Sequence, residues 1–382
     1  METIESFTKI WKKILIRDSE KIAGIGIGSG LSGTALFFLI DYRITGDIKS
    51  LKHFYLLLEE LIKRLNNSNY NELLLADITE MTYLVSVSSR IIKDTYDVTE
   101  LKKQLEELLY SLSKKPIQKK EFDPFTGAFY PGYYFSCRNS KESYLRPFFE
   151  LLTSKTINKN GIYFDSRFQP GKICLSITHG MAFYIVLLCR REYPFLSQNV
   201  IHELLKGYVD FVLENQMDFE ICGCFFPDYI GENIKTRLCL CYGDLGIIYS
   251  LFLAGIKLND KKLQDKCKIM LSKTLDRKLS SETRINNSSL LYGDAGVYLF
   301  LRKLVNINKT LIEDKNAVGF WKNKLKSGLL DIDKEYFLSG EFVVKEGIRP
   351  LTFSEGITGS LICLKANNWN FLQQLTFPFY LQ

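Results

Sequence analysis

Residues 30–40 read GlyLeuSerGlyThrAlaLeuPhePheLeuIle, a glycine turn that opens directly into an apolar run, and this arrangement recurs along the chain. Clear copies start at Gly243, Gly293 and Gly356, and weaker ones cover residues 77–83, 123–132 and 178–183. Seven markers separated by 51, 46, 53, 63, 50 and 63 residues summarise the pattern: Gly30, Met81, Gly127, Gly180, Gly243, Gly293 and Gly356. A regular period of this length indicates an array of one repeated structural unit.

Each unit, of roughly fifty residues, is long enough for two helices and their connections. Between the markers, charged stretches carry apolar residues at helical spacing, which is typical of surface helices. These stretches cover residues 51–65, 101–112, 204–213, 262–275 and 317–329. The runs after the glycines, such as residues 181–188 and 247–253, are apolar on nearly every side and predict buried helices. Parallel strands alternating with single helices are the alternative, but they would recur at a shorter period.

The first copy, residues 30–42, and the last, residues 356–364, are as apolar as the middle ones. An open repeat array needs polar end repeats, so we expect this array to close. The expected fold is all-α, an α/α toroid of seven helical hairpins with an inner ring of seven helices inside an outer ring of seven, formed as a single domain over residues 1–382. The glycine turns would then share one pole, where helix N-termini favour an anion such as a thiolate or an enolate.

Composition restricts the class of protein further. The net charge of +7 in 382 residues is mild, which disfavours a nucleic-acid partner. We expect no membrane span, since no apolar run approaches the ~18 residues required, and the N-terminus does not read as a signal peptide. A cytoplasmic location follows as the expectation, and nine cysteines, an odd number, then indicate reduced thiols.

Five motifs resemble the lanthionine cyclase (LanC-like) family in content and order. They are SerGlyLeuSerGly at 29–33, SerIleThrHisGly at 176–180, LeuCysTyrGlyAspLeuGly at 240–246, LeuTyrGlyAspAlaGly at 291–296 and SerGluGlyIleThrGly at 354–359. The resemblance covers essentially the whole chain. It implies an α/α toroid whose polar cleft joins the cysteine thiols of a dehydrated precursor peptide to dehydroalanine or dehydrobutyrine, forming the thioether rings of lanthipeptides. It also implies a lanthipeptide dehydratase as a candidate partner.

The resemblance further implies a zinc ion with three protein ligands, a Cys of the fifth repeat and a Cys-His pair of the sixth. It also implies two functional residues that are not zinc ligands, an Asp of the third repeat and a His of the fourth. Position by position, these correspond to Cys241 as a metal ligand and to Asp123 and His179. The sixth repeat departs from the family, because residues 291–293 read LeuTyrGly instead of Cys-His-Gly. A zinc site needs at least three protein ligands, so we expect no tightly bound zinc and no other cofactor.

Substitute ligands are conceivable. Asp244 and Asp294 directly follow turn glycines, and Cys222, Cys224 and Cys239 lie in or before the fifth unit. An Asp at such a position more often stabilises the first turn of a helix. The cysteine pairs are spaced more closely than the usual Cys-x-x-Cys clamp, which favours buried cysteines.

Cyclisation without a metal is physically possible, because a free thiol is already partly ionised and positioning of the two reactants lowers the barrier. We expect His179 to accept the thiol proton and to return a proton to the enolate carbon, with Asp123 either orienting the imidazole or helping to shuttle the proton. Tyr292 and Tyr242 would donate hydrogen bonds to the enolate oxygen. The alternatives are a structural role for His179, a pore-lining role for Tyr292, and a vestigial or merely buried Cys241.

Two other functions stay open. The first is a non-catalytic LanC-like scaffold that binds the modified peptide or its dehydratase. The second is a glycosidase, since α/α toroids also host enzymes with paired carboxylates. The candidate acids would be Asp123, Asp244, Asp294 and Glu355.

Overall fold

The computed structural model describes residues 3–68, 75–92, 97–138, 140–154, 166, 169–239, 241–308, 311–312, 316–332 and 349–365; Leu240 of the fifth motif lies outside them. Within these ranges the chain forms helices joined by turns and loops, with one isolated β-bridge between Cys174 and Tyr229. None of the helices in this part of the chain combines the length and apolar character needed to cross a bilayer. The chain divides into two compact units. The single domain expected over residues 1–382 stays a prediction.

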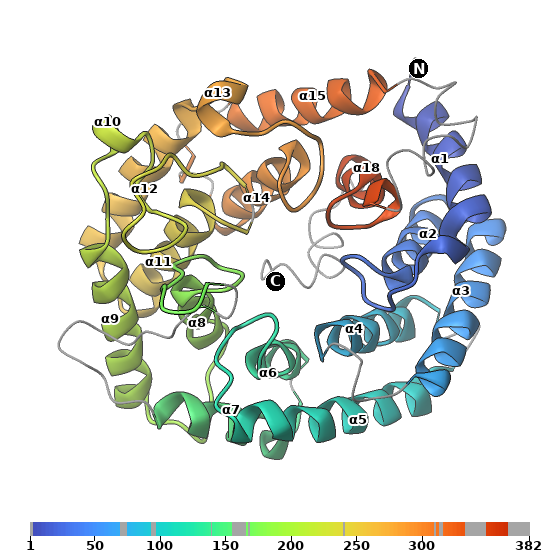
Figure 1. Cartoon of the computed structure of the whole chain (residues 1–382), viewed down its shortest axis with the longest axis horizontal. Coiled ribbons are helices and arrows are strands. Elements are labelled where there is room, and N and C mark those ends of the chain that lie inside the picture. The colour runs from blue at the N-terminus through green and yellow to red at the C-terminus, as the bar shows by residue number, and fades with distance from the viewer. Residues whose placement is uncertain are drawn as a thin grey trace. The chain divides into compact units, whose positions relative to one another are not determined.

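The first unit comprises Met1–Leu109, Asn286–Asn306 and Lys315–Leu381. Its helices are α1 (Ile4–Asp18), α2 (Leu31–Thr45), α3 (Ile48–Asn67), α4 (Leu75–Ile91), α14 (Asp294–Ile307), α15 (Ala317–Leu330) and α18 (Ile357–Lys365), with short 3₁₀ turns at Ser19–Lys21 and Arg349–Leu351. Helix α5 (Thr99–Gln118) begins in this unit and ends in the second. Helix α2 is central and packs against α3, α4 and α18, and Figure 1 shows α18 beside α2.

The first and last described repeats of the array contact each other within this unit. The indole of Trp11 in α1 donates a hydrogen bond of 3.2 Å to the hydroxyl of Thr358 in α18. Asp41 of α2 accepts from Lys12 of α1 and from Lys365 of α18. Contact between the two ends of the array is what a closed arrangement of repeats requires.

The second unit comprises Tyr110–Ile285 and Ile307–Asp314, together with Gln382. Its helices are α6 (Phe129–Cys137), α7 (Glu142–Thr153), α8 (Met181–Cys189), α9 (Gln198–Glu214), α10 (Phe219–Cys222), α11 (Asp244–Lys257), α12 (Lys261–Asp276) and α13 (Ser280–Thr283). Helix α8 packs against both α9 and α11, and α11 packs against α12 (Figure 1). Every residue from Met181 to Leu188 is buried, because α8 has neighbours on more than one side.

The predicted helices are confirmed, and consecutive helices pack against each other in the pairs α2–α3, α6–α7, α8–α9 and α11–α12. The five amphipathic stretches lie in α3, α5, α9, α12 and α15, and the two quoted apolar runs lie in α8 and α11. The prediction for the second copy was wrong. Helix α4 begins at Leu75 and continues through residues 77–83, so Met81 lies inside a helix and not at a turn. The segment contains no glycine, and its residues adopt helical backbone angles without penalty.

The glycine markers share a close approach between backbone segments. A Cβ added at each of them would lie 2.2 to 2.7 Å from a backbone atom of the residue six positions earlier, closer than any real Cβ contact. The six markers that are glycines all show this approach: Gly30, Gly127, Gly180, Gly243, Gly293 and Gly356. The chain therefore folds back on itself before each of these helices, and only a residue without a side chain fits.

Candidate functional site

Asp123 is fixed by a turn that precedes α6. Its Oδ1 accepts hydrogen bonds from the backbone N–H groups of Phe125 (3.0 Å) and Thr126 (2.8 Å) and from the Thr126 hydroxyl (3.0 Å). Burial raises the pKa of Asp123, but the hydrogen bonds and charge of His179 and the bonds from Thr126 outweigh it, so the pKa lies below its ordinary value. The carboxylate is therefore ionised at neutral pH.

His179 directly precedes Gly180, the N-cap of α8. Its backbone N–H donates to the hydroxyl of Ser176 (3.1 Å), and its Nδ1 lies 3.2 Å from Oδ2 of Asp123. The His179 side chain is 11% exposed and that of Asp123 is 3% exposed. An ionised carboxylate can only accept, so Nδ1–H donates to Asp123, and whenever the ring is neutral its lone pair lies on Nε2. The pair thus supplies a base whose tautomer is set by a buried carboxylate.

Aromatic side chains surround this pair. The ring of Phe125 meets the imidazole edge to face at 5.8 Å between centroids, and the ring of Tyr242 lies 6.1 Å away at an interplanar angle of 30°. Burial raises the pKa of Tyr242, so its hydroxyl stays protonated and can donate. Three of the residues singled out from the sequence, Asp123, His179 and Tyr242, therefore lie together in the second unit.

Tyr229 extends the aromatic wall, and sequence reasoning missed it. Its ring lies 6.5 Å from that of Tyr242. Tyr229 comes from an irregular segment, residues 225–233, that pairs with residues 173–175 through the bridge at Cys174 and a 2.9 Å hydrogen bond from the backbone N–H of Ile230 to the carbonyl of Ile173. No helical period marks this segment, and its glycine, Gly231, lies in a turn that is followed by polar residues instead of an apolar run, so the repeat pattern did not point to Tyr229.

Cys241 is buried close to the same wall. Its side chain is 2% exposed, and its Sγ lies 4.0 Å from Sγ of Cys239. Burial raises the pKa of Cys241 well above its ordinary value. The Thr178 hydroxyl donates to the backbone carbonyl of Cys241 (3.3 Å), which ties the His179 turn to the Cys241 turn.

The donor set does not fit a zinc ion. Among the residues that the structure describes, no group of three or more His, Cys, Asp or Glu side chains is arranged to hold a metal. Asp244, a proposed substitute, is occupied otherwise: its Oδ1 accepts from the backbone of Phe225 and Phe226, and its Oδ2 meets Thr274 and Arg277. As the first residue of α11 it has the structural role expected for an Asp after a turn glycine. We assign no chemical step to a metal.

The other acidic candidates and Tyr292 belong to the first unit. Asp294 is the first residue of α14 and lies 3.5 Å from the ammonium of Lys324, and Glu355 pairs with Arg349 at 2.6 Å. Each of these carboxylates therefore has a cationic partner of its own. The backbone N–H of Tyr292 donates to the hydroxyl of Ser289 (3.3 Å), and its expected role at the enolate stays a prediction.

Comparisons with known proteins agree with this architecture. The family described as "Lanthionine synthetase C-like protein" matches residues 22–378. No curated protein matches the sequence. Among solved structures, nisin cyclase is similar with a TM-score of 0.74 over 99% of this chain and 98% of that chain, at 16% identity. At that identity the likeness concerns the fold alone. The expected fold class, the all-α fold of this family, is confirmed.

Proposed function

The chain belongs to the lanthionine synthetase C-like family, and on that premise we propose that it is a thioether cyclase. It would add the cysteine thiols of a dehydrated precursor peptide to dehydroalanine or dehydrobutyrine. The single observation that carries the proposal is the contact of 3.2 Å between His179 Nδ1 and Asp123 Oδ2, with the Tyr242 ring beside the imidazole. A protein that shares the fold, nisin cyclase, is a cyclase by name.

The reaction balances without an oxidant or a reductant. Nε2 of His179 accepts the proton of the peptide thiol while the sulfur forms a bond with the β-carbon of the dehydro residue. The alkene electrons move onto the adjacent carbonyl as an enolate, to which the Tyr242 hydroxyl donates a hydrogen bond. The imidazolium then returns the proton to the α-carbon. Asp123 holds the imidazole in the required tautomer and stabilises the imidazolium.

We propose that this cyclisation proceeds without zinc. A peptide thiol with a pKa of about 8.5 needs roughly 2 kcal/mol to be fully ionised at pH 7, at about 1.4 kcal/mol per pKa unit. A positioned general base contributes about 10²- to 10⁴-fold in rate. This contribution equals or exceeds the free energy needed to ionise the thiol. Holding the thiol and the alkene in contact contributes on the order of 7 to 11 kcal/mol in favourable cases. These residues can therefore replace what a metal would supply.

One observation favours a second function, a non-catalytic scaffold. Residues 291–292 read LeuTyr where the family resemblance implies two zinc ligands, and loss of a metal site is also what a former enzyme would show. Such a scaffold would bind the dehydrated peptide, or a dehydratase that carries it, without closing the rings.

A thiol-counting assay separates the two functions. A dehydrated peptide with one cysteine is incubated with the protein, and remaining thiols are alkylated and counted by mass spectrometry, because cyclisation itself leaves the mass unchanged. We expect the wild type to consume thiol above the spontaneous rate and His179→Ala to fall to that rate. His202→Ala is the matched control, since His202 is exposed on α9. Tight binding with only spontaneous thiol loss in the wild type would favour the scaffold.

A further inference from the structure

Two cysteine thiols meet beside the candidate active site. Sγ of Cys239 lies 4.0 Å from Sγ of Cys241, and both side chains are buried, with 1% and 2% of their surface exposed. A disulfide bond is about 2.05 Å long, so the two sulfur atoms need to approach by about 2 Å to form one. Holding two reacting groups in contact raises their effective concentration by orders of magnitude. The proposed cyclisation uses neither thiol.

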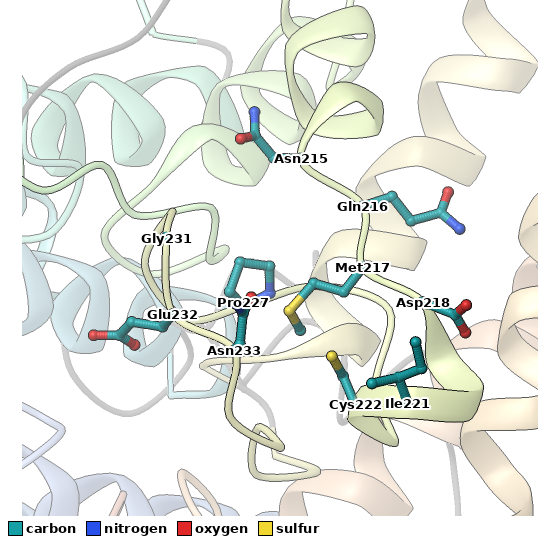
Figure 2. Close-up of a pocket in the computed structure, with 10 residues that line it drawn as sticks. All are labelled: Asn215, Gln216, Met217, Asp218, Ile221, Cys222, Pro227, Gly231, Glu232 and Asn233. Atoms are coloured by element: carbon teal, nitrogen blue, oxygen red, sulfur yellow. The ribbon is translucent and has the colours of Figure 1, made fainter.

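A second pair of cysteines with the same spacing is arranged differently. Cys222 and Cys224 are also separated by one residue, Gly223, which has a left-handed φ of 68°. Cys222 lines a pocket at the C-terminal end of α9, together with Met217 (Figure 2). Sγ of Cys224 is buried instead and accepts a hydrogen bond of 3.3 Å from the backbone N–H of Thr236. One intervening residue therefore does not by itself place both sulfur atoms in the same buried site.

The first thiol pair belongs to the turn that positions Tyr242. The thiol of Cys239 donates a hydrogen bond to the backbone carbonyl of Tyr242, at 3.6 Å from sulfur to oxygen. The carbonyl of Cys241 accepts from the hydroxyl of Thr178 (3.3 Å), the residue before His179. A disulfide would remove the S–H donor of Cys239 and draw both sulfur atoms together. The turn would shift with them, and so would Tyr242, whose ring lies 6.1 Å from that of His179.

We propose that Cys239 and Cys241 are a redox-active pair, which hydrogen peroxide oxidises to a disulfide that slows cyclisation. One thiol attacks the peroxide, which breaks the O–O bond and gives a sulfenic acid and one water. The other thiol attacks the sulfenic sulfur, forms the S–S bond and releases the second water. The two sulfur atoms lose two electrons, and the peroxide oxygens take them. Because both thiols are buried, a small oxidant reaches them more easily than a bulky disulfide such as that of glutathione.

Formation of the disulfide does not depend on the proposed function, whereas its effect on cyclisation rests on it. Full-length protein is treated with hydrogen peroxide, its remaining thiols are alkylated under denaturing conditions, and it is digested with trypsin. The peptide of residues 238–257 contains the proposed pair and no other cysteine, and that of residues 207–235 contains only Cys222 and Cys224. A disulfide leaves a peptide without alkyl groups and two hydrogen atoms lighter. We expect this form to be at least about fivefold more abundant in residues 238–257 than in residues 207–235, and to disappear with dithiothreitol.

The effect on cyclisation is measured by the same thiol count, after the peroxide has been removed. Oxidised wild type should consume peptide thiol at least about tenfold more slowly than reduced wild type, since loss of one donor to an enolate oxygen costs about 10²-fold or more. Dithiothreitol followed by desalting should restore the rate; the desalting is needed because dithiothreitol itself adds to dehydroalanine. Cys239→Ser is the matched variant, because its hydroxyl can still donate to the carbonyl of Tyr242 but cannot form a disulfide. Its rates before and after peroxide should agree within about twofold.

Equal abundance of the disulfide form in the two peptides, or its absence from residues 238–257, would overturn the proposed pair. A cross-link from residues 238–257 to residues 173–190, which contain Cys174 and Cys189, would do the same. A disulfide that forms without changing the rate would overturn its effect on cyclisation. The mass measurement needs no turnover, so a wild type that forms the disulfide but does not cyclise would contradict the proposed function alone. Cyclisation without the disulfide would contradict only the pair.

Discussion

The carboxylate of Asp123 reaches the imidazole of His179 across 56 positions of sequence, with Oδ2 at 3.2 Å from Nδ1. Its other oxygen, Oδ1, is held by the backbone N–H groups of Phe125 and Thr126. The turn before α6 thus fixes the carboxylate, and the carboxylate fixes the ring at the start of α8. Two neighbouring repeats bring this carboxylate and this imidazole together because both turns are anchored by their own hydrogen bonds.

Asp123→Asn is expected to slow cyclisation without unfolding the turn. The Asn side-chain oxygen can still accept from Phe125 and Thr126, but its NH₂ group faces Nδ1 and favours the opposite tautomer of His179. We expect the rate constant for thiol consumption to fall by about 10²- to 10⁴-fold, as for loss of a tautomer-setting carboxylate, while peptide affinity changes less than about twofold. Thiol counting and anisotropy measure the two quantities separately.

Thr126→Val is the control for this substitution. It removes the hydroxyl that donates to Asp123 Oδ1 and leaves the carboxylate in place. Its rate should stay within about fivefold of the wild type, since the ionised carboxylate loses one hydroxyl donor but keeps the backbone donors of Phe125 and Thr126. An Asp123→Asn rate close to that of Thr126→Val would remove Asp123 from its positioning role.

Much of the fold follows from the sequence, because its signals are local. Helical spacing and apolar runs depend on neighbours three and four residues away, and they predicted α3, α8 and α11. The glycine markers were predicted as turns, but the reason for glycine, a backbone six residues earlier that approaches the Cβ position, needed coordinates. At Met81 the repeat pattern predicted a turn, but this residue lies inside α4.

The candidate site was predictable in part. Asp123, His179 and Tyr242 were named because each belongs to a motif next to a glycine turn. Tyr229 was missed because it reaches Tyr242 through the pairing of two irregular segments, which leaves no period in the sequence. Contacts between segments that are distant in the chain depend on tertiary packing, and a single sequence does not encode them in a readable spacing.

Metal removal is expected to leave the reaction unchanged. We expect elemental analysis of purified protein to find well under one zinc per chain, since a lone family ligand, Cys241, does not hold the ion. After dialysis against a chelator, the thiol-consumption rate should stay within about twofold of the rate before dialysis, because the proposed step uses His179 and Asp123. About one zinc per chain, lost together with activity in Cys241→Ser, would show instead that substitute ligands complete a site.

Acid should weaken the contact between the two ends of the array. Burial raises the pKa of Asp41, but the hydrogen bonds from Lys12, Lys365 and Ser50 outweigh it, so the folded-state pKa lies below its ordinary value. The ionised carboxylate then stabilises the fold above the unfolded-state value of about 3.9, and this contribution disappears as the pH falls through the folded-state pKa. The free energy of unfolding, measured by urea denaturation, should be lower at pH 3 than at pH 7. This difference should be smaller in Asp41→Asn than in the wild type.

At pH 7, Asp41→Asn should lower the free energy of unfolding by roughly 2 to 4 kcal/mol, because two ammonium groups lose a buried partner. Asp47→Asn is the matched control. Asp47 also pairs with Lys12, but its side chain is 34% exposed and Asn preserves the cap of α3. The free energy of unfolding of Asp47→Asn should fall by less than about 1 kcal/mol, as is usual for exposed ion pairs. Equal losses would mean that the network is not centred on Asp41.

Gly243→Ala is expected to destabilise the protein for two separable reasons. Gly243 has a φ of 76°, which disfavours a side chain, and an added Cβ would lie 2.6 Å from the carbonyl oxygen of Arg237. Gly171 has a φ of 80° with no atom within 4 Å of the Cβ position, so Gly171→Ala isolates the backbone term. We expect losses of about 1 kcal/mol for Gly171→Ala and roughly 2 to 4 kcal/mol for Gly243→Ala, measured by urea denaturation. Equal losses would show that the close approach six residues back relaxes freely, and that it does not explain the recurring glycine.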